Sequence, residues 1–112
     1  MNWIELTDET QLEAIKKQSK VQPIVIFKHS TRCSISVMAK GRLEREPAGA
    51  DNLPFYYLDL LKFRPISNKI ADDFKVHHES PQILLIKNGE CVYEESHNGI
   101  NMGDILEQST LA

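Results

Sequence analysis

Short apolar runs alternate along this chain with longer stretches in which apolar residues recur every three or four positions. The short runs predict β-strands at about residues 3–6, 24–28, 55–60, 82–87 and 90–95. The longer stretches predict amphipathic helices at about residues 8–19, 34–46, 65–74 and from 102 onward. Strands that alternate with helices before a final hairpin and helix predict an α/β fold, with a mixed central sheet covered by helices on both faces.

Local signals support several of these element boundaries. Asp8 and Gln11 have the spacing of a capping box, and Pro65 suits the first position of a helix. Asn88-Gly89 predicts a tight hairpin turn, and residues 47–52, which contain Pro and Gly, predict a second turn. Two of the helices would bury apolar stripes, one made of Ile35, Met38, Ala39 and Leu43 and the other of Ile66, Ile70 and Phe74.

The stretch that carries chemistry joins the predicted strand at 24–28 to the predicted helix at 34–46, with Cys33 at the junction. The first turn of a helix has unpaired N–H groups and a partial positive charge, which favour a thiolate over a thiol. Ser36 follows three positions later on the same helix face, so its hydroxyl is expected to reach the Cys33 sulfur. This is the spacing of a C-x-x-C redox site whose second cysteine is replaced by serine. The sequence therefore predicts a disulfide exchanger that works with a single thiol.

Composition and charge restrict the class of protein. The 112 residues fit a single domain, 1–112, and a hydrophobic content of 41% with 26% charged residues is typical of an ordinary folded protein. The formal net charge of −3 argues against general nucleic-acid binding. No apolar run approaches the length of a membrane span, and the N-terminus shows no secretory signal. We therefore expect a cytoplasmic protein that binds neither nucleic acid nor membrane.

Cysteine and histidine usage predicts no metal site. Cys33 and Cys91 are the two cysteines, fewer than a secreted disulfide scaffold normally carries, and both are expected to be thiols in a reducing cytosol. The four histidines have no zinc-finger spacing, and the adjacent His77 and His78 point apart on a helix or a strand. Cys91 is expected to be a small residue of the sheet. A role as resolving thiol would need its Cα within about 7 Å of that of Cys33.

Several motifs together resemble a known family. The element order is similar to that of the thioredoxin fold, with Cys33 at the position of its nucleophile and Ser80-Pro81 at the position of its cis-proline. Asn98-Gly99 resembles the turn with a glycine near the active site of that fold. More narrowly, residues 28–36 (Lys-His-Ser-Thr-Arg-Cys-Ser-Ile-Ser) and 78–82 (His-Glu-Ser-Pro-Gln) resemble the monothiol, YtxJ-like bacilliredoxins of the bacillithiol redox system. The resemblance covers essentially the whole chain.

This resemblance implies that the protein removes bacillithiol from mixed disulfides on cytosolic proteins. Cys33 would attack the mixed disulfide of a bacillithiolated client and take up the bacillithiol, and a second thiol or a recycling reductase would release it. Bacillithiol would be the exchanging low-molecular-weight thiol, with no tightly bound cofactor. The residues expected around the catalytic Cys33 are Ser34 and Ser36, which would support the thiolate, and Thr31, Arg32, Ser80, Pro81 and Gly99, which would bind substrate.

The residues around Cys33 and Pro81 give further expectations. Family members often have proline directly after the nucleophile or nearby, whereas Ser34 and Ile35 stand here, so a rigid active-site turn is not implied. Arg32 is the first choice for a cationic lip that binds the malate carboxylates of bacillithiol. Its neighbours Lys28 and His29 are weaker choices, and all three are otherwise expected to be solvated surface residues. The resemblance also implies a cis bond before Pro81, although most such bonds are trans, and this would leave the backbone of Ser80 free to pair with substrate.

Two other functions remain open on the sequence alone. Monothiol glutaredoxins also have a C-x-x-S site and hold iron–sulfur clusters between two protomers, but they have glycine and phenylalanine where this chain has Ser34 and Ile35. Visible absorbance after anaerobic reconstitution would favour such a cluster carrier. The other alternative is a partner-binding module of thioredoxin fold in which the thiol is incidental, and Cys33 would then undergo no exchange.

Overall fold

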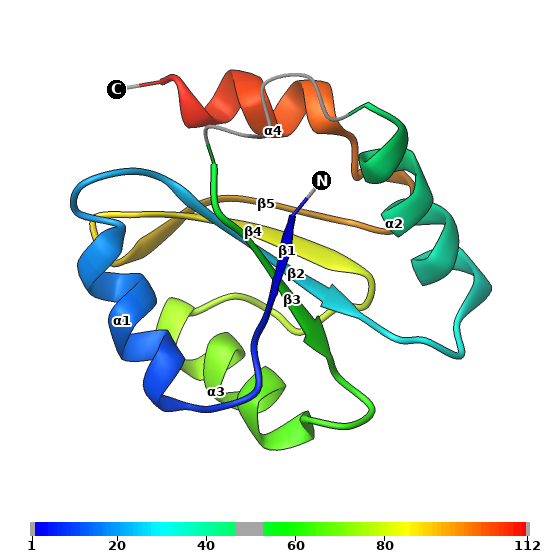
Figure 1. Ribbon diagram of the computed structural model, residues 1–112, viewed down its shortest axis with the longest axis horizontal. Helices are drawn as coiled ribbons and strands as arrows, with labels where there is room; N and C mark the ends of the chain where they lie inside the picture. Colours follow the sequence, from blue (N-terminus) through cyan, green and yellow to red (C-terminus); the bar gives the residue numbers. More distant parts are fainter. Residues whose placement is uncertain (1, 47–52, 112) are drawn as a thin grey trace.

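The computed structural model describes residues 2–46 and 53–111, so the turn predicted at 47–52 lies outside the described residues. Its centre is a five-stranded sheet with the strand order β1-β3-β2-β4-β5 (Figure 1). The strands are β1 (Trp3–Glu5), β2 (Ile24–His29), β3 (Phe55–Asp59), β4 (Gln82–Lys87) and β5 (Glu90–Ser96). The helical segments are α1 (Thr10–Gln18), α2 (Ser34–Arg45), α3 (Arg64–Phe74), the 3₁₀ turn η2 (His97–Gly99) and α4 (Met102–Ser109). The predicted order of elements is confirmed.

The sheet is mixed, as the sequence pattern predicted. The central strand β2 pairs parallel to β3 and antiparallel to β4, while β1 extends the parallel half and β5 extends the antiparallel half. The hairpin between β4 and β5 turns at Asn88 and Gly89, whose φ angles of 53° and 77° are both positive. A type I′ turn requires positive φ at both central residues, so the predicted hairpin is confirmed.

Helices cover both faces of the sheet (Figure 1). α1 and α3 pack on one face, over Ile24 and Ile26 of β2, while α2 and α4 pack on the other, over Val25 and Phe27. Successive side chains of a strand point to opposite faces, so β2 contributes to both layers, and all six of its residues are buried. By the same alternation the last two residues of β2 face different helices: Lys28 faces α3 and His29 faces α2.

The buried face of α2 differs from the predicted one. Ala39 and Leu43 are buried as expected, but Ile35 and Met38 are 43% and 63% exposed, and Ser36 is fully buried in their place. The prediction followed apolar residues alone. The helix instead turns its single buried hydroxyl inward, because two polar groups at the end of β2 bind it there. The stripe of Ile66, Ile70 and Phe74 on α3 is buried as predicted.

Helix α1 begins slightly later than its caps suggested. It starts at Thr10, whose N–H donates to Asp8 Oδ1 at 2.8 Å. Gln11 Oε1 accepts in return from the N–H groups of Thr7 at 2.7 Å and Asp8 at 2.9 Å. The Asp8–Gln11 pair therefore binds the chain at the helix entrance, as a capping box does. In α3, Pro65 lies in the first turn but follows Arg64, the first helical residue.

Candidate active site

Cys33 lies between the end of β2 and the start of α2, at the predicted junction. It is the N-cap residue of α2 and has extended backbone angles, with φ −102° and ψ 120°. Its N–H donates to the Ser30 carbonyl at 3.1 Å, and its carbonyl accepts from the Val37 N–H at 3.0 Å. The side chain is half-buried and the cysteine is free. A thiol in this position is accessible and lies beside the first-turn N–H groups, where the helix dipole favours a negative charge.

Three segments, one of which carries Cys33, lie together at one edge of the sheet. In the β2–β4 ladder Lys28 lies opposite Gln82, and in the β4–β5 ladder Gln82 lies opposite Ser96. The loop after β2, the Ser80-Pro81 bond before β4 and the η2 turn after β5 therefore emerge at the same edge. Of the site residues predicted from the sequence, this edge brings together Cys33 and its neighbours, Ser80, Pro81 and Gly99.

The hydroxyl of Ser36 has different partners from the predicted one. Ser36 Oγ lies 2.6 Å from His29 Nδ1, and it accepts a hydrogen bond from the Ser30 N–H at 3.0 Å. Ser36 is 0% exposed. Among the described residues the Ser36 hydroxyl makes these two hydrogen bonds and none to the Cys33 sulfur. Ser36 therefore ties α2 to the loop that carries Cys33, and any influence on the thiol is exerted through that loop.

His29 is a buried residue rather than part of a surface lip. Its ring is stacked on Phe27, with centroids 5.6 Å apart and planes at 27°, and it is tilted against Tyr57 at 5.4 Å. Burial lowers the pKa of His29, and the charge of Lys40 acts in the same direction. The His29 ring therefore stays neutral down to a lower pH than the ring of a solvated histidine does. A neutral ring is a suitable hydrogen-bond partner for the uncharged Ser36 hydroxyl.

Lys28 is also buried, which contradicts both sequence interpretations of it. Its side chain is 0% exposed, because β2 is the central strand and α3 covers the end of it. The ammonium donates to the Ser67 carbonyl at 3.2 Å and lies 3.2 Å from His78 Nδ1. Burial lowers the pKa of Lys28 to about 8. Sequence reasoning missed the contact with His78, which is 50 positions away; a lysine that ends an otherwise apolar central strand was the available signal.

The Ser80-Pro81 peptide bond is cis, which confirms the prediction made from the resemblance. Pro81 is buried, and its carbonyl accepts from the His97 N–H at 3.0 Å. The Ser80 hydroxyl is buried without a hydrogen-bond partner among the described residues. A buried hydroxyl normally has a partner. This edge of the sheet therefore offers an unused hydrogen-bonding group beside the cis-proline.

Gly99 is a position of close approach, but its neighbour in this structure is Glu95. A Cβ built at Gly99 would lie 2.5 Å from Glu95 Cδ and 2.7 Å from Glu95 Oε1. Gly99 itself is exposed at the end of η2. Arg42 of α2 donates to the carbonyls of His97 at 3.1 Å and Ile100 at 3.0 Å, and so fixes this turn against α2.

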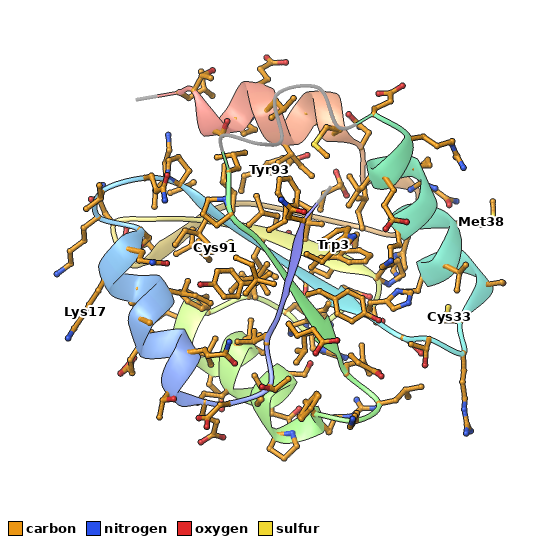
Figure 2. The ribbon with its side chains drawn as sticks, in the orientation of Figure 1. Trp3, Lys17, Cys33, Met38, Cys91 and Tyr93 are labelled. Atoms are coloured by element: carbon orange, nitrogen blue, oxygen red, sulfur yellow. The ribbon has the colours of Figure 1, made fainter. Side chains whose placement is uncertain are left out.

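The other predicted substrate-binding residues are exposed. Thr31, Arg32 and Ser34 flank Cys33 with exposed side chains. Thr31 lines a shallow groove of about 400 Å³ beside α2, together with His29, Val37, Lys40, Gly41, Glu44 and Tyr57. Arg32 is the one member of the predicted cationic lip that remains at the surface, and Figure 2 shows the adjacent Cys33 at the lower end of α2.

Cys91 is distant from Cys33. It pairs with Ile86, which pairs with Ile24 at the start of β2, whereas Cys33 lies beyond the other end of β2. Six strand residues extend roughly 16 Å or more, and Figure 2 shows the two sulfurs in separate parts of the molecule. Burial raises the pKa of Cys91 to about 11. Cys91 is thus a small residue of the sheet, and the condition for an internal resolving thiol is not met.

The described residues contain neither a helix that could span a membrane nor a cluster of side chains that could hold a metal ion. No helix in residues 2–46 and 53–111 has the length and apolar character needed to cross a bilayer. Within the same residues, no group of three or more His, Cys, Asp or Glu side chains is arranged to hold a metal ion.

Solved structures share this architecture. A thioredoxin-fold protein provisionally described as an oxidoreductase is 32% identical, with a TM-score of 0.83 over 97% of this chain and 94% of that chain. Thioredoxin O2 from Arabidopsis thaliana is 16% identical, with a TM-score of 0.73 over 95% of this chain and 92% of its own. Fasciola hepatica thioredoxin is 18% identical, with a TM-score of 0.73 over 96% of this chain and 99% of its own. The fold is therefore the thioredoxin fold.

The sequence gives a narrower match. Residues 4–105 match the family model described as Monothiol bacilliredoxin BrxC. That range includes both motifs from which the resemblance was predicted, around Cys33 and around Pro81. It covers nearly the whole chain, and Cys33 and the buried Ser36 lie within it. This protein belongs to the monothiol bacilliredoxin family.

Proposed function

We propose that Cys33 is the nucleophile of a thiol–disulfide exchanger that removes bacillithiol from bacillithiolated client proteins in the cytoplasm. The observation that carries this proposal is the place of Cys33. It is a half-buried thiol at the N-terminus of α2, at the same sheet edge as cis-Pro81, with a serine in place of a second cysteine. Family membership favours this function over a cluster carrier or a binding module with an incidental thiol.

The exchange would proceed in two balanced steps. The Cys33 thiolate attacks the bacillithiol sulfur of the mixed disulfide, a new S–S bond forms at Cys33, and the client leaves as a thiolate that takes a proton from water. A second thiolate, from a free low-molecular-weight thiol or a recycling reductase, then attacks the adduct and releases Cys33. The second thiol must come from another molecule, because position 36 is serine and Cys91 lies at the far end of the sheet.

The groups around Cys33 give the substrate its binding points. The backbone of Ser80, beside the cis bond to Pro81, would hydrogen-bond to the peptide-like part of the disulfide. Exposed Arg32 and Thr31 would bind the carboxylates of the malate moiety. Exposed Ile35 and Met38 would contact the client surface.

Intact-protein mass spectrometry of a bacillithiolated client tests this proposal. We expect the wild-type protein to remove the adduct from the client and to carry it on Cys33, while Cys33→Ala leaves the client unchanged. Cys91→Ala is the matched control, since it removes the other thiol and should react like the wild type. Full removal of the adduct by Cys33→Ala would refute the proposal.

A further inference from the structure

A lysine ammonium is buried in this protein without a carboxylate partner. Lys28 is 0% exposed, and its recorded contacts are the Ser67 carbonyl and His78 Nδ1, each at 3.2 Å. Among the described residues, no carboxylate forms an ion pair with it, and burial is the cause that lowers its pKa. An unpaired buried charge is costly.

Lys28 and His78 together hold one positive charge. An ammonium can only donate, so when Lys28 is charged, His78 Nδ1 accepts and the histidine carries its proton on Nε2. Burial lowers the pKa of His78, and the charges of Lys28 and Arg64 lower it further. The other groups facing the pair are Glu79, whose charge acts in the opposite direction, and His77, whose charge acts in the same direction as Lys28. At neutral pH the charge therefore resides on Lys28, whose pKa is about 8.

The pair lies beneath the edge at which Cys33 and the cis-proline meet. Lys28 is opposite Gln82, the residue that follows Pro81, and His78 precedes Ser80 by two positions. Cys33 follows Lys28 by five positions, so at most about 17 Å of extended chain separates the two residues. Lys28 is buried and Cys33 is half-buried, and salt screens charges at such sites less than charges in open solvent.

We infer that the Lys28–His78 pair is a buried positive charge that stabilises the ionised form of the Cys33 thiol, with Lys28 as its carrier and His78 as its hydrogen-bond acceptor. Both are positioning residues, since neither is in contact with the reacting sulfur. The importance of the pair for exchange rests on the proposed function, but the coupling between Lys28 and Cys33 is a property of the folded chain alone.

Reciprocal titration tests the coupling. If Lys28 stabilises the Cys33 thiolate, the thiolate must stabilise charged Lys28 by the same free energy. The ε-carbon resonance of Lys28, identified by its loss in Lys28→Met, is titrated in isotope-labelled wild type and in Cys33→Ser. We expect a lower titration midpoint for Lys28 in Cys33→Ser, by about 0.5 to 1 pH unit.

The second half of the test is alkylation of Cys33 by iodoacetamide as a function of pH, in a Cys91→Ala background. The midpoint of the rate profile should move upward in Lys28→Met by the amount found in the lysine titration. Lys20→Met, which removes an exposed lysine before β2, should leave the midpoint unchanged. His78→Leu removes the acceptor and should lower the Lys28 midpoint.

The outcomes separate this inference from the proposed function. Equal Lys28 midpoints in wild type and Cys33→Ser would overturn the inference, and this comparison leaves the buried pair intact, so misfolding of a Lys28 variant cannot confuse it. If bacillithiol removal proceeds but neither midpoint moves, the inference fails and the proposed function stands. If both midpoints move but no client loses its adduct, the charge coupling stands and the proposed function fails.

Discussion

Replacing Ser36 by alanine tests whether this serine supports the fold or the thiolate. The substitution removes the hydroxyl that lies 2.6 Å from His29 Nδ1 and accepts from the Ser30 N–H at 3.0 Å. It adds no atom and leaves a void smaller than a methyl group. We therefore expect its effect to come from hydrogen bonding and to appear as a loss of stability.

The size of that loss follows from the surroundings of the two partners. A buried polar group left without a partner costs about 1–3 kcal/mol, and a net hydrogen bond contributes about 0.5–1.5 kcal/mol. His29 is 4% exposed, so water cannot replace the hydroxyl at its ring. Ser30 is half-buried, so water can reach its N–H. The expected decrease in the free energy of unfolding is about 2 kcal/mol, most of it from His29.

Equilibrium unfolding in guanidinium chloride measures this decrease as a lower midpoint with an unchanged slope. Ser34→Ala is the matched control, because Ser34 is an exposed serine of the same helix turn and should change stability by less than about 0.5 kcal/mol. An unfolding free energy of Ser36→Ala within 0.5 kcal/mol of wild type, together with a changed alkylation rate of Cys33, would refute this reasoning. The hydroxyl would then act on the sulfur directly.

Three further predictions concern the same edge of the sheet. Ser36→Cys restores C-x-x-C spacing and should form an internal disulfide with Cys33 under mild oxidation. Mass spectrometry would show the disulfide as the loss of two hydrogens. A variant that stays reduced would contradict the placement of residues 33 and 36 on one face of the helix. Lys28 has a pKa of about 8 in the folded protein and about 10.4 unfolded. Between pH values of about 8 and about 10.4 the unfolded chain binds more protons than the folded one, so the free energy of unfolding of the wild type should rise with pH. The rise relative to Lys28→Met should reach about 3 kcal/mol. Parallel pH profiles of unfolding for the two proteins would count against a buried charge. Gly99→Ala should displace the Glu95 carboxylate from the Ser96 N–H, which it binds at 2.9 Å. The cost in unfolding free energy should be about 1 kcal/mol and should largely vanish in a Glu95→Ala background.

The fold could be predicted from the sequence because its elements are consistent at every level. Alternating strands and helices, the Asp8–Gln11 cap and the Asn88-Gly89 turn each specify local structure, and each is found in place. The cis bond before Pro81 depended on the resemblance, since nothing in the local residues distinguishes it from the common trans form.

The surroundings of Cys33 were harder to predict because polarity misled the interpretation in both directions. Lys28 and His29 are polar and were assigned to the surface, yet they end a central strand that helices cover on both faces. Ile35 and Met38 are apolar and were assigned to the core, yet Ser36 takes the inward position. A periodicity argument ranks residues by hydrophobicity alone. It cannot anticipate a buried hydroxyl whose partners lie on another element, nor a contact between Lys28 and a histidine 50 positions away.

The buried polar side chains of the described chain are themselves concentrated at the Cys33 edge. Six are buried, and Ser19 alone lies elsewhere, at the β4–β5 turn. The others are Lys28, His29, Ser36, Ser67 and Gln82, and each either ends or opens a strand at that edge or contacts a residue that does. Since each buried polar group must be matched by a partner, such a cluster lowers the freedom of the residues around it. An apolar strand end would serve stability alone more simply. The polar end of β2 holds the Cys33 loop on one face of the sheet through His29, and places a positive charge behind it on the other face through Lys28.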